Sequence, residues 1–329
     1  MSRIPCRQVN SRLGSNNSNP LVYAIVEMSL DLSIVIVTFN DRENLRRCLN
    51  SIKESAGNLS LQVIIYDNSS SDGTLAMLKE FPGIKVIEGP DNIGVPRALN
   101  RAARLAEAPL LLSLDSDTIV SHGALTRLIA FMVSREDVAV AGARLYYENG
   151  QLQASARRFP AAINGIFGRH SLLTRWFPEN PISRKYLMNW MDDAVEPFFP
   201  EWVSAACMVI RKTAFDALGG FDERFFLYWS DADFCYRAGK AGHKIACVPG
   251  AKVIHCEQYK PRGRKNPRMI LDFHKGVYKF YSMHSASDAF HPMRWIAFFG
   301  LSLRCGLLLL LNQLKEKSGK YQVQSQVTD

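Results

Sequence analysis

The chain has 329 residues, of which 47% are apolar and 22% are charged, a composition typical of globular proteins that excludes disordered, collagenous and repeat classes. A net charge of +9 suits an anionic partner, such as a phosphate ligand, a nucleic acid or an acidic membrane face. The seven cysteines stand singly, without a Cys-x-x-Cys pair. We therefore expect reduced thiols in a cytoplasmic protein rather than a zinc site or a disulfide framework.

The first 27 residues lack the apolar segment of about 7–15 residues that a signal peptide needs. Met28 stands immediately before the first strand pattern. We therefore expect residues 1–29 to be a disordered tail or the product of an upstream start codon.

From Leu32 onward, short β-rich segments alternate with helical patterns. We predict strands at residues 32–37, 61–66, 84–87, 110–114 and 138–143. The spacing of apolar residues predicts helices around residues 45–52, 96–106 and 125–132. This order predicts an α/β fold with a mostly parallel, Rossmann-like sheet flanked by helices, which binds ligands at the carboxyl ends of its strands.

The second half of the chain is less regular. Residues 144–200 carry many Arg, Pro and aromatic residues, and we predict a long, partly irregular connection there. After it we predict a strand at 202–210, a short helix, a helix at about 230–241, and two strands at 245–248 and 253–255.

Acidic residues follow two of the predicted strands. Asp67 begins the segment Asp67-Asn68-Ser69-Ser70-Ser71-Asp72-Gly73-Thr74, which is also typical of a turn. Asp115 and Asp117 follow the apolar strand 110–114. Carboxylates in this arrangement suit a hard divalent cation such as Mg²⁺ or Mn²⁺. The alternative is a turn that caps the next helix.

A third acidic position lies at the start of the late helix, in Tyr228-Trp229-Ser230-Asp231-Ala232-Asp233. Ser230-x-x-Asp233 has the pattern of a capping box, and acids in a first turn interact favourably with the helix dipole. An acid held beside a cleft could also serve as a general base. The pattern alone leaves both interpretations of Asp231 open.

Taken together, these motifs resemble those of the family 2 glycosyltransferases, especially the bacterial rhamnosyltransferase-like members that extend cell-surface polysaccharides. The resemblance covers about residues 32–256. It rests on the order and spacing of Ser33-Ile34-Val35-Ile36-Val37-Thr38-Phe39-Asn40, of Tyr66 to Thr74, of Asn92-Ile93-Gly94 with Asn100, of Asp115-Ser116-Asp117, and of Gly219-Gly220-Phe221-Asp222-Glu223 leading to Asp231-Ala232-Asp233.

The resemblance implies a GT-A fold over residues 30–256, with a nucleotide-sugar half at 30–143, an acceptor half at 144–256 and a C-terminal acceptor-side extension. It also implies an inverting glycosyltransferase that uses Mg²⁺ or Mn²⁺. The expected donor is a UDP- or dTDP-linked sugar, such as rhamnose, and the expected acceptor is a hydroxyl of a saccharide or a lipid-linked saccharide.

Roles for individual residues follow from the same resemblance. Asp231 matches the general base, and Asp117 and His255 match the metal ligands. The matching donor-binding positions are Thr38, Asn40, Asp67, Arg97, Asn100 and Asp115, where Asp67 would accept a hydrogen bond from the pyrimidine ring. Many relatives have Glu-Asp where this chain has Ser230-Asp231, so the role of that Glu is absent or supplied elsewhere.

Two alternatives belong to other function classes. Phosphoryl-transfer enzymes of the haloacid dehalogenase type also use Asp-x-Asp after an apolar strand, but their pattern needs Thr or Val where this chain has Ile119. A non-enzymatic basic protein could bind nucleic acid through the basic run 260–268. No aromatic-interleaved nucleic-acid motif accompanies that run, and we expect no nucleic-acid partner.

We divide residues 257–329 into a basic linker and a C-terminal amphipathic helical segment. Residues 295–311 are mostly apolar but include Arg304, whereas a spanning helix needs about 20 apolar residues. We predict a helix that lies in the membrane interface, flanked by the basic run and by Lys315, Lys317 and Lys320. The protein would then be cytoplasmic and peripherally attached to the inner face of the cell membrane. Packing of this helix in the protein core is the alternative.

Overall fold

The computed structural model describes residues 30–159, 184, 186–256 and 266–317. Our predictions for residues 1–29, for most of the basic run 260–268 and for the side chains of Lys315, Lys317 and Lys320 lie outside the described part of the chain.

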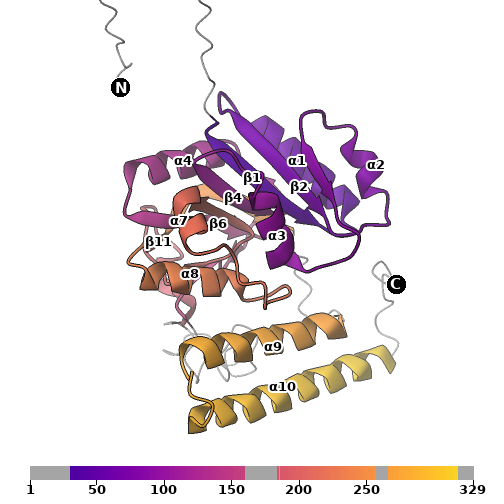
Figure 1. Cartoon of the computed structure of the whole chain (residues 1–329), viewed down its shortest axis with the longest axis vertical. Coiled ribbons are helices and arrows are strands. Elements are labelled where there is room, and N and C mark those ends of the chain that lie inside the picture. The colour runs from indigo at the N-terminus through magenta and orange to yellow at the C-terminus, as the bar shows by residue number, and fades with distance from the viewer. Residues whose placement is uncertain (1–29, 160–183, 185, 257–265, 318–329) are drawn as a thin grey trace, which may run out of the picture.

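A mixed sheet forms the centre of the molecule (Figure 1). Its strands are β1 (Leu32–Thr38), β2 (Leu61–Asp67), β3 (Lys85–Glu88), β4 (Leu110–Asp115), β5 (Thr118–Val120), β6 (Val138–Tyr146), β7 (Leu152–Gln153), β10 (Cys207–Arg211) and β11 (Lys244–His255). The order is β3-β2-β1-β4-β10-β6-β11-β5, and β7 pairs with β6. A separate pair joins β8 (Ala156–Arg157) to β9 (Trp202–Val203).

The strand directions bring four predicted site residues to one edge of the sheet. β1, β2 and β4 are mutually parallel, and β10 is antiparallel to both β4 and β6. β6 therefore runs parallel to β4, and β11 runs parallel to β6. Thr38, Asp67, Asp115 and His255 are the last residues of β1, β2, β4 and β11, so all four lie at the same edge.

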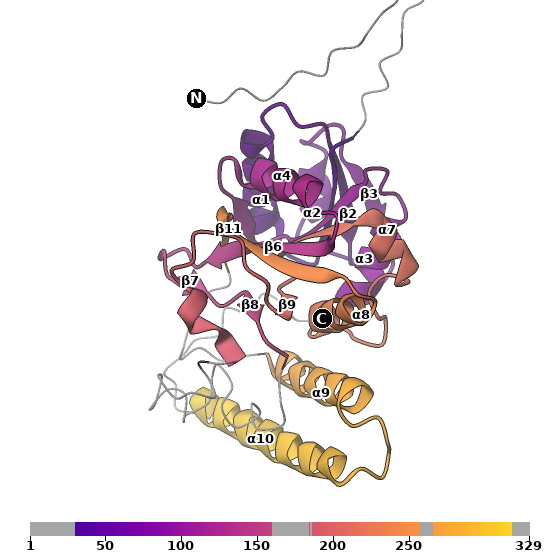
Figure 2. The same ribbon diagram turned by 90° about the vertical axis from the view of Figure 1, so that its left-hand side faces the viewer.

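Helices cover both faces of the sheet, as Figures 1 and 2 show. They are α1 (Arg42–Ser55), α2 (Thr74–Leu78), α3 (Val95–Ala103), α4 (Ala124–Ser134), α7 (Lys212–Ala217), α8 (Ser230–Lys240), α9 (Pro267–His284) and α10 (Pro292–Lys317), with a 3₁₀ turn at Asn189–Met191. Alternate residues of β1 point to opposite faces: Ile34 packs with α1, α2 and α4, and Val35 packs with α3, α7 and α8. This burial on both faces explains the continuous apolar sequence of β1.

Most of the predicted strands and helices are confirmed, but two strand predictions were wrong. The predicted strand 202–210 is broken at residues 204–206, so that β9 and β10 belong to different sheets. The predicted strands 245–248 and 253–255 form one strand, β11, whose register shifts between Val248 and Lys252. Pro249 and Gly250, a pair typical of turns, lie in an irregularity inside that strand. The short strand β5 and the helix α9 were not predicted.

The C-terminal helices form an antiparallel hairpin below the sheet domain (Figures 1 and 2). α9 faces the domain and buries Phe280 in the cluster that holds α3 and α8. α10 lies on the far side of α9. Within the described residues, Pro292–Leu314 is long and apolar enough to cross a membrane, and it is mostly exposed. The C-terminal segment is thus helical, and its exposure does not support the alternative in which this helix packs in the protein core.

Candidate active site

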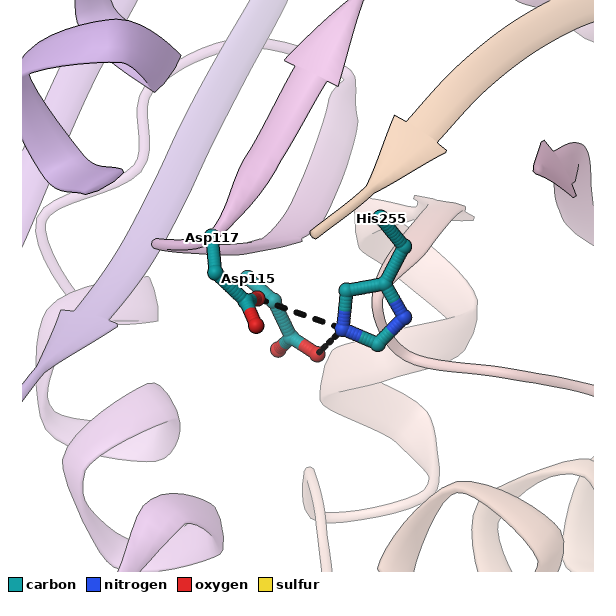
Figure 3. Close-up of side chains that lie close together, drawn as sticks. All are labelled: Asp115, Asp117 and His255. Carbon is teal, nitrogen blue, oxygen red and sulfur yellow. Dashed lines mark ion pairs between the residues drawn. The ribbon is translucent and has the colours of Figure 1, made fainter. Parts of the chain in front are cut away.

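Two carboxylates and an imidazole meet at the carboxyl edge of the sheet (Figure 3). Asp115 ends β4, Asp117 follows in the turn to β5, and His255 ends β11, where it pairs with Thr118 of β5. His255 Nε2 lies 3.2 Å from Asp117 Oδ1 and 3.7 Å from Asp115 Oδ2. One ligand atom from each residue lies within 4.8 Å of the others. The short β5 strand thus brings His255 to the Asp-x-Asp turn.

Gln153 fixes the orientation of the His255 ring. Its Oε1 atom lies 2.8 Å from His255 Nδ1, and because an amide oxygen can only accept, Nδ1 carries the proton in this pair. The other ring nitrogen, Nε2, faces Asp115 and Asp117. A metal-binding histidine is commonly held by a second hydrogen bond of this kind. The donor set of two carboxylates and one imidazole therefore fits a divalent cation such as Mn²⁺ or Mg²⁺.

A second contact supports the Asp-x-Asp turn from the start of α1. The hydroxyl of Ser116 donates to Asp41 Oδ2 at 2.7 Å, and Asn44 Nδ2 donates to Asp41 Oδ1 at 2.7 Å. Burial raises the pKa of Asp41, and the nearby Asp117 carboxylate raises it further. Asp41 precedes the first residue of α1 but makes no capping hydrogen bond. Its carboxylate therefore holds Ser116, and with it the turn that carries both metal-ligand candidates.

Thr38 and Asp67 lie side by side at the ends of β1 and β2, where their Cα atoms are paired in the sheet register. Each is only 1% exposed. Asp67 Oδ2 accepts from the backbone N–H of Ser70 at 2.9 Å, so the turn interpretation is correct for that oxygen. Asp67 Oδ1 and Thr38 Oγ1 are buried without a hydrogen-bond partner among the described residues. Since unpaired buried polar atoms are costly and rare, this pair points to a ligand.

Asp231 is the second residue of α8 and is partly buried. Its Oδ1 accepts from the backbone N–H of Ala232 at 2.8 Å, and its Oδ2 accepts from that of Ala205 at 3.3 Å. The carbonyl of the next residue, Ala206, accepts from the N–H of Asp115 at 3.1 Å. Burial raises the pKa of Asp231, although the two backbone hydrogen bonds oppose the shift. The break between β9 and β10 thus contacts both Asp231 and the end of β4 at Asp115.

The capping interpretations of these acids were wrong. The residue before α8 is Trp229, with φ of 78° and no side-chain capping bond, so Ser230 lies inside the helix. Asp233 is fully buried and instead accepts from Arg237 Nε at 2.8 Å. The residue before α4 is Gly123, so Asp115 and Asp117 do not cap that helix.

Comparison with known proteins identifies the family. Residues 33–200, about half of the chain, match the sequence model of glycosyl transferase family 2. The chain belongs to this family. The predicted family 2 resemblance is therefore confirmed, and nothing supports the haloacid dehalogenase alternative.

Two relatives of this glycosyltransferase are named for rhamnosyl transfer. The N-acetylglucosaminyl-diphospho-decaprenol L-rhamnosyltransferase of Mycobacterium tuberculosis (strain ATCC 25618 / H37Rv) is 29% identical over 290 residues, which cover 84% of this chain and 92% of the relative. Rhamnosyltransferase WbbL of Escherichia coli (strain K12) is 23% identical over 239 residues, which cover 70% and 84%. Because they cover 84% and 70% of this chain, both matches extend beyond residue 200.

Two solved structures confirm the predicted GT-A fold. GalNAc-T7 with UDP, GalNAc and Mn²⁺ gives a TM-score of 0.59 at 17% identity, covering 80% of this chain and 50% of that protein. The mannosyltransferase PcManGT from Pyrobaculum calidifontis, in complex with GDP-Man and Mn²⁺, gives 0.55 at 13% identity, covering 90% and 77%.

The remaining donor-site candidates of this glycosyltransferase shape its loops. Asn100 donates to the carbonyl of Phe221 at 2.8 Å and accepts from its N–H at 2.9 Å. The neighbouring Gly220 fits there because a Cβ atom would lie 2.5 Å from Asn100 Oδ1. Arg97, one turn earlier on α3, has an exposed side chain whose Nε lies 3.7 Å from Glu223 Oε2. Both residues therefore join α3 to the segment that leads to α8.

Asn40 shapes the loop beside β2 in a similar way. Its Oδ1 accepts from the N–H of Ser71 at 2.7 Å, and its own N–H donates to Ser70 Oγ at 2.9 Å. Asn40 has a positive φ of 50°, a conformation that Asn tolerates better than most residues. The sequence identified Asn40 as a donor-site candidate, and these contacts show that it also fixes the Ser70–Ser71 turn.

Proposed function

We propose that this chain is a metal-dependent, inverting glycosyltransferase that moves a sugar from a nucleoside diphosphate to a hydroxyl of a lipid-linked saccharide. The observation that carries the proposal is the connection between its two acidic centres. The Asp115, Asp117 and His255 cluster and the Asp231 carboxylate are joined through Ala205 and Ala206. A donor held at the first centre would thus lie beside a base at the second.

Asp117 and His255 would hold the cation, with Asp115 contacting the cation or the donor. When bound, Mg²⁺ or Mn²⁺ would neutralise the negative charge that develops on the departing diphosphate. Gln153 holds the His255 ring with Nε2 toward the two carboxylates, and Asp41 holds the turn through Ser116. Both structural relatives were solved with Mn²⁺, which supports a divalent metal here.

Asp231 would take the proton of the acceptor hydroxyl as the oxygen of that hydroxyl attacks the anomeric carbon. Attack from the face opposite the diphosphate inverts that carbon. Burial raises the pKa of Asp231, which makes its carboxylate a stronger base than an exposed one. A well-placed general base contributes about 10²–10⁴-fold to the rate. The N–H groups of Ala205 and Ala232 orient the carboxylate without neutralising it.

Thr38 and Asp67 would receive the nucleobase. A pyrimidine ring N–H can donate to Asp67 Oδ1, and a base carbonyl can accept from the Thr38 hydroxyl, so both orphaned atoms would be satisfied. Uracil and thymine carry the same ring N–H and carbonyls, which fits a UDP- or dTDP-linked donor. Asn40, Arg97 and Asn100 would position the donor through the loops they hold. Rhamnose is the sugar that the names of the relatives favour.

The C-terminal helix α10 favours peripheral attachment to a membrane. Its apolar side chains are exposed and some of its polar side chains are buried, which is the reverse of a helix on the surface of a soluble protein. One face of α10 is apolar and exposed along its length: Ile296, Phe299, Leu303, Leu307, Leu310 and Leu314. Arg304 and Asn312, in contrast, are partly or fully buried. Arg304 therefore does not interrupt the outer apolar face. Such a face would lie in the acyl boundary, next to a lipid-linked acceptor like the diphospho-decaprenol compound in the name of one relative.

A panel of nucleotide sugars tests the proposed function. UDP- and dTDP-linked sugars, dTDP-rhamnose among them, are incubated with the protein and Mn²⁺ or Mg²⁺. Release of the free nucleoside diphosphate is measured with and without a lipid-linked diphosphate saccharide as acceptor. We expect one pyrimidine donor to be used, with activity lost in excess chelator. Full activity in chelator would refute the metal assignment, and no use of any donor would refute the proposed reaction.

A further inference from the structure

We propose that a cationic cleft between α9 and the segment 224–228 binds the diphosphate group of a lipid-linked acceptor. This inference rests on the proposed function, whose acceptor it places. The cleft has a volume of about 320 Å³, near the lower limit of ligand pockets, which span roughly 300–1,000 Å³. Its lining combines charged and aromatic side chains: Arg224, Phe226, Tyr228, Asp272, Lys275 and Lys279.

The cleft carries more basic than acidic side chains. Arg224, Lys275 and Lys279 line it with one acid, Asp272, and Arg224 is also paired with Asp222. The Asp272 carboxylate accepts from the backbone N–H of Tyr228 at 3.3 Å, and burial raises its pKa. Asp272 therefore anchors the loop, and the three cations still outnumber the two acids. Arg and Lys side chains are the usual partners of phosphate oxygens.

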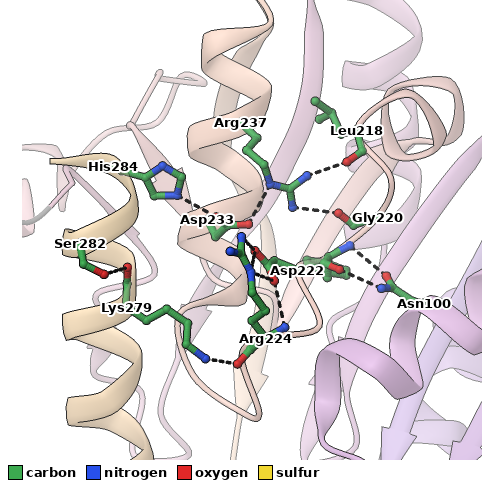
Figure 4. A network of polar contacts seen from close by, with 11 residues as sticks. Asn100, Leu218, Gly220, Asp222, Arg224, Asp233, Arg237, Lys279, Ser282 and His284 are labelled. Atoms are coloured by element: carbon green, nitrogen blue, oxygen red, sulfur yellow. Dashed lines mark hydrogen bonds and ion pairs between the residues drawn. The ribbon is translucent and has the colours of Figure 1, made fainter. Parts of the chain in front are cut away.

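The cations are held by the surrounding structure. Lys279 Nζ contacts the carbonyl of Arg224 and lies 5.3 Å from the ring centroid of Phe225. Figure 4 shows this contact together with the pairing of Arg224 and Asp222. A further contact ties α9 to α8: His284 Nε2 on α9 lies 2.8 Å from Asp233 Oδ1 on α8. The cleft is thus a junction of fixed elements rather than a gap beside a loose helix.

A buried donor adjoins the cleft. Gly276 lines it, and a Cβ atom at this position would lie 2.8 Å from Trp229 Cδ1. The neighbouring indole atom, Trp229 Nε1, is buried without a hydrogen-bond partner among the described residues. Trp229 itself has the left-handed φ of 78°. Gly276 thus lets the Trp229 ring pack directly behind the wall of the cleft.

The position of the cleft matches the path of a lipid-linked acceptor. Tyr228, in its wall, lies three residues before Asp231. The carbonyl of Phe226 accepts from the N–H of Val95 at the start of α3, at 2.7 Å, so the same wall contacts the donor half. On the other side, α9 is backed by the apolar helix α10 (Figures 1 and 2). A saccharide at Asp231 would place its diphosphate in the cleft and its lipid toward α10.

The test measures binding rather than turnover. Farnesyl diphosphate serves as the probe, in excess chelator so that the metal site contributes nothing, and binding is followed by calorimetry on the full chain. Lys275→Gln and the double variant with Lys279→Gln should bind it at least about 10-fold more weakly. Lys240→Gln, an exposed lysine on α8, is the matched control and should bind like the wild type. Lys275→Gln alone leaves the Lys279 contact with Arg224 intact, so the test does not depend on the double variant folding.

Three further binding measurements distinguish a lipid-linked diphosphate from other phosphate ligands and test the proposed function separately. Inorganic pyrophosphate should bind more weakly than farnesyl diphosphate, and vesicles of phosphatidylglycerol should bind the lysine variants nearly as well as the wild type. Equal affinity for pyrophosphate and farnesyl diphosphate would overturn the acceptor assignment. So would lysine variants that bind farnesyl diphosphate like the wild type, or that lose only the binding to vesicles. UDP binding with Mn²⁺ is measured in parallel. Its absence would reject the proposed function while leaving a lysine-dependent cleft in place.

Discussion

The carboxylate of Asp231 is held by the backbone N–H of Ala205, one residue before the carbonyl that holds Asp115. A single turn at the end of β9 thus sets the base candidate relative to the strand that carries the metal-ligand candidates. Gly142 on β6 makes room for this turn, because a Cβ atom there would lie 2.7 Å from the side chain of Val203. Substitutions at Gly142 or Ala205 would therefore be expected to move both centres together.

Gln153 provides a test of the metal site that leaves its ligands in place. Gln153→Leu removes the acceptor that keeps the proton on Nδ1 of His255, so the ring can rotate or change tautomer. We expect Mn²⁺ affinity to fall about 10–100-fold, as for other residues that support metal ligands, measured by Mn²⁺ titration with the nucleotide present. Gln153→Glu should restore much of it. The nearby exposed Gln151→Leu is the control, and equal losses in both variants would contradict the role of Gln153.

Asp67 should distinguish the nucleobase from the diphosphate. Asp67→Asn places an amide where the ring N–H of uracil or thymine would donate to the unpaired Oδ1. Loss of a hydrogen bond to a charged group costs about 1.5–3 kcal/mol, so UDP affinity should fall by roughly 10-fold or more. Binding of inorganic pyrophosphate with Mn²⁺ should not change, because pyrophosphate lacks a base. If the affinity for pyrophosphate falls as much as the affinity for UDP, then Asp67 acts through the fold and not through contact with the nucleobase.

The sequence predicted the apolar strands well, because burial on both faces makes a strand easy to find. Such strands end at Thr38, Asp67, Asp115 and His255. The roles of these four residues came from the family resemblance and stay predictions. Gln153 was missed because its strand has only two residues and lies in a segment without periodicity. Asp41 was missed because an acid before a helix is typical of an N-cap, whereas its carboxylate binds Ser116 instead.

Longer-range contacts explain the remaining errors. The predicted strand 202–210 is apolar except for Ser204, and one serine is too weak a sign that its first part pairs with β8 while its second part enters the main sheet. Pro249 and Gly250 favour a turn locally, but pairing with β6 on both sides keeps β11 continuous. Tertiary pairing decided both cases, and no single-sequence pattern records it.

The raised pKa of Asp231 predicts how stability changes with pH. Folding raises this pKa above the value of about 3.9 for an unfolded chain, so the folded state binds the proton more tightly. The free energy of unfolding therefore falls as pH rises through the raised pKa, and the penalty is complete above it. Asp231→Asn removes this penalty, so its melting temperature relative to the wild type should increase from about pH 4 to about pH 8.

The exposed Asp216→Asn on α7 serves as the control for the same series, because it removes a carboxylate from an exposed position. The difference between the two series then isolates the effect of burial. A relative melting temperature of Asp231→Asn that decreases as pH rises would contradict the assignment of Asp231 as a carboxylate whose burial raises its pKa.

The outer face of α10 predicts which substitutions release the protein from membranes. Leu303 is 77% exposed, and Leu307 lies one turn further along the same face. Burial of a Leu side chain contributes about 1.5–3 kcal/mol, so Leu303→Glu with Leu307→Glu should lower affinity for anionic vesicles at least about 100-fold in a flotation assay. Gln313→Glu adds an acid beside this face and should change binding far less. If the double variant fails to fold, then the face belongs to the protein core.

The kinetics of Asp231→Asn test the central claim most directly. The variant keeps the shape of the side chain and an oxygen that can accept from Ala205 or Ala232, but it cannot take a proton. We predict that kcat for sugar transfer falls by about 10²-fold or more, while the affinity for the nucleotide donor with Mn²⁺ stays within about twofold of the wild type. A variant that transfers sugar at nearly the wild-type rate would contradict the account and place the base elsewhere.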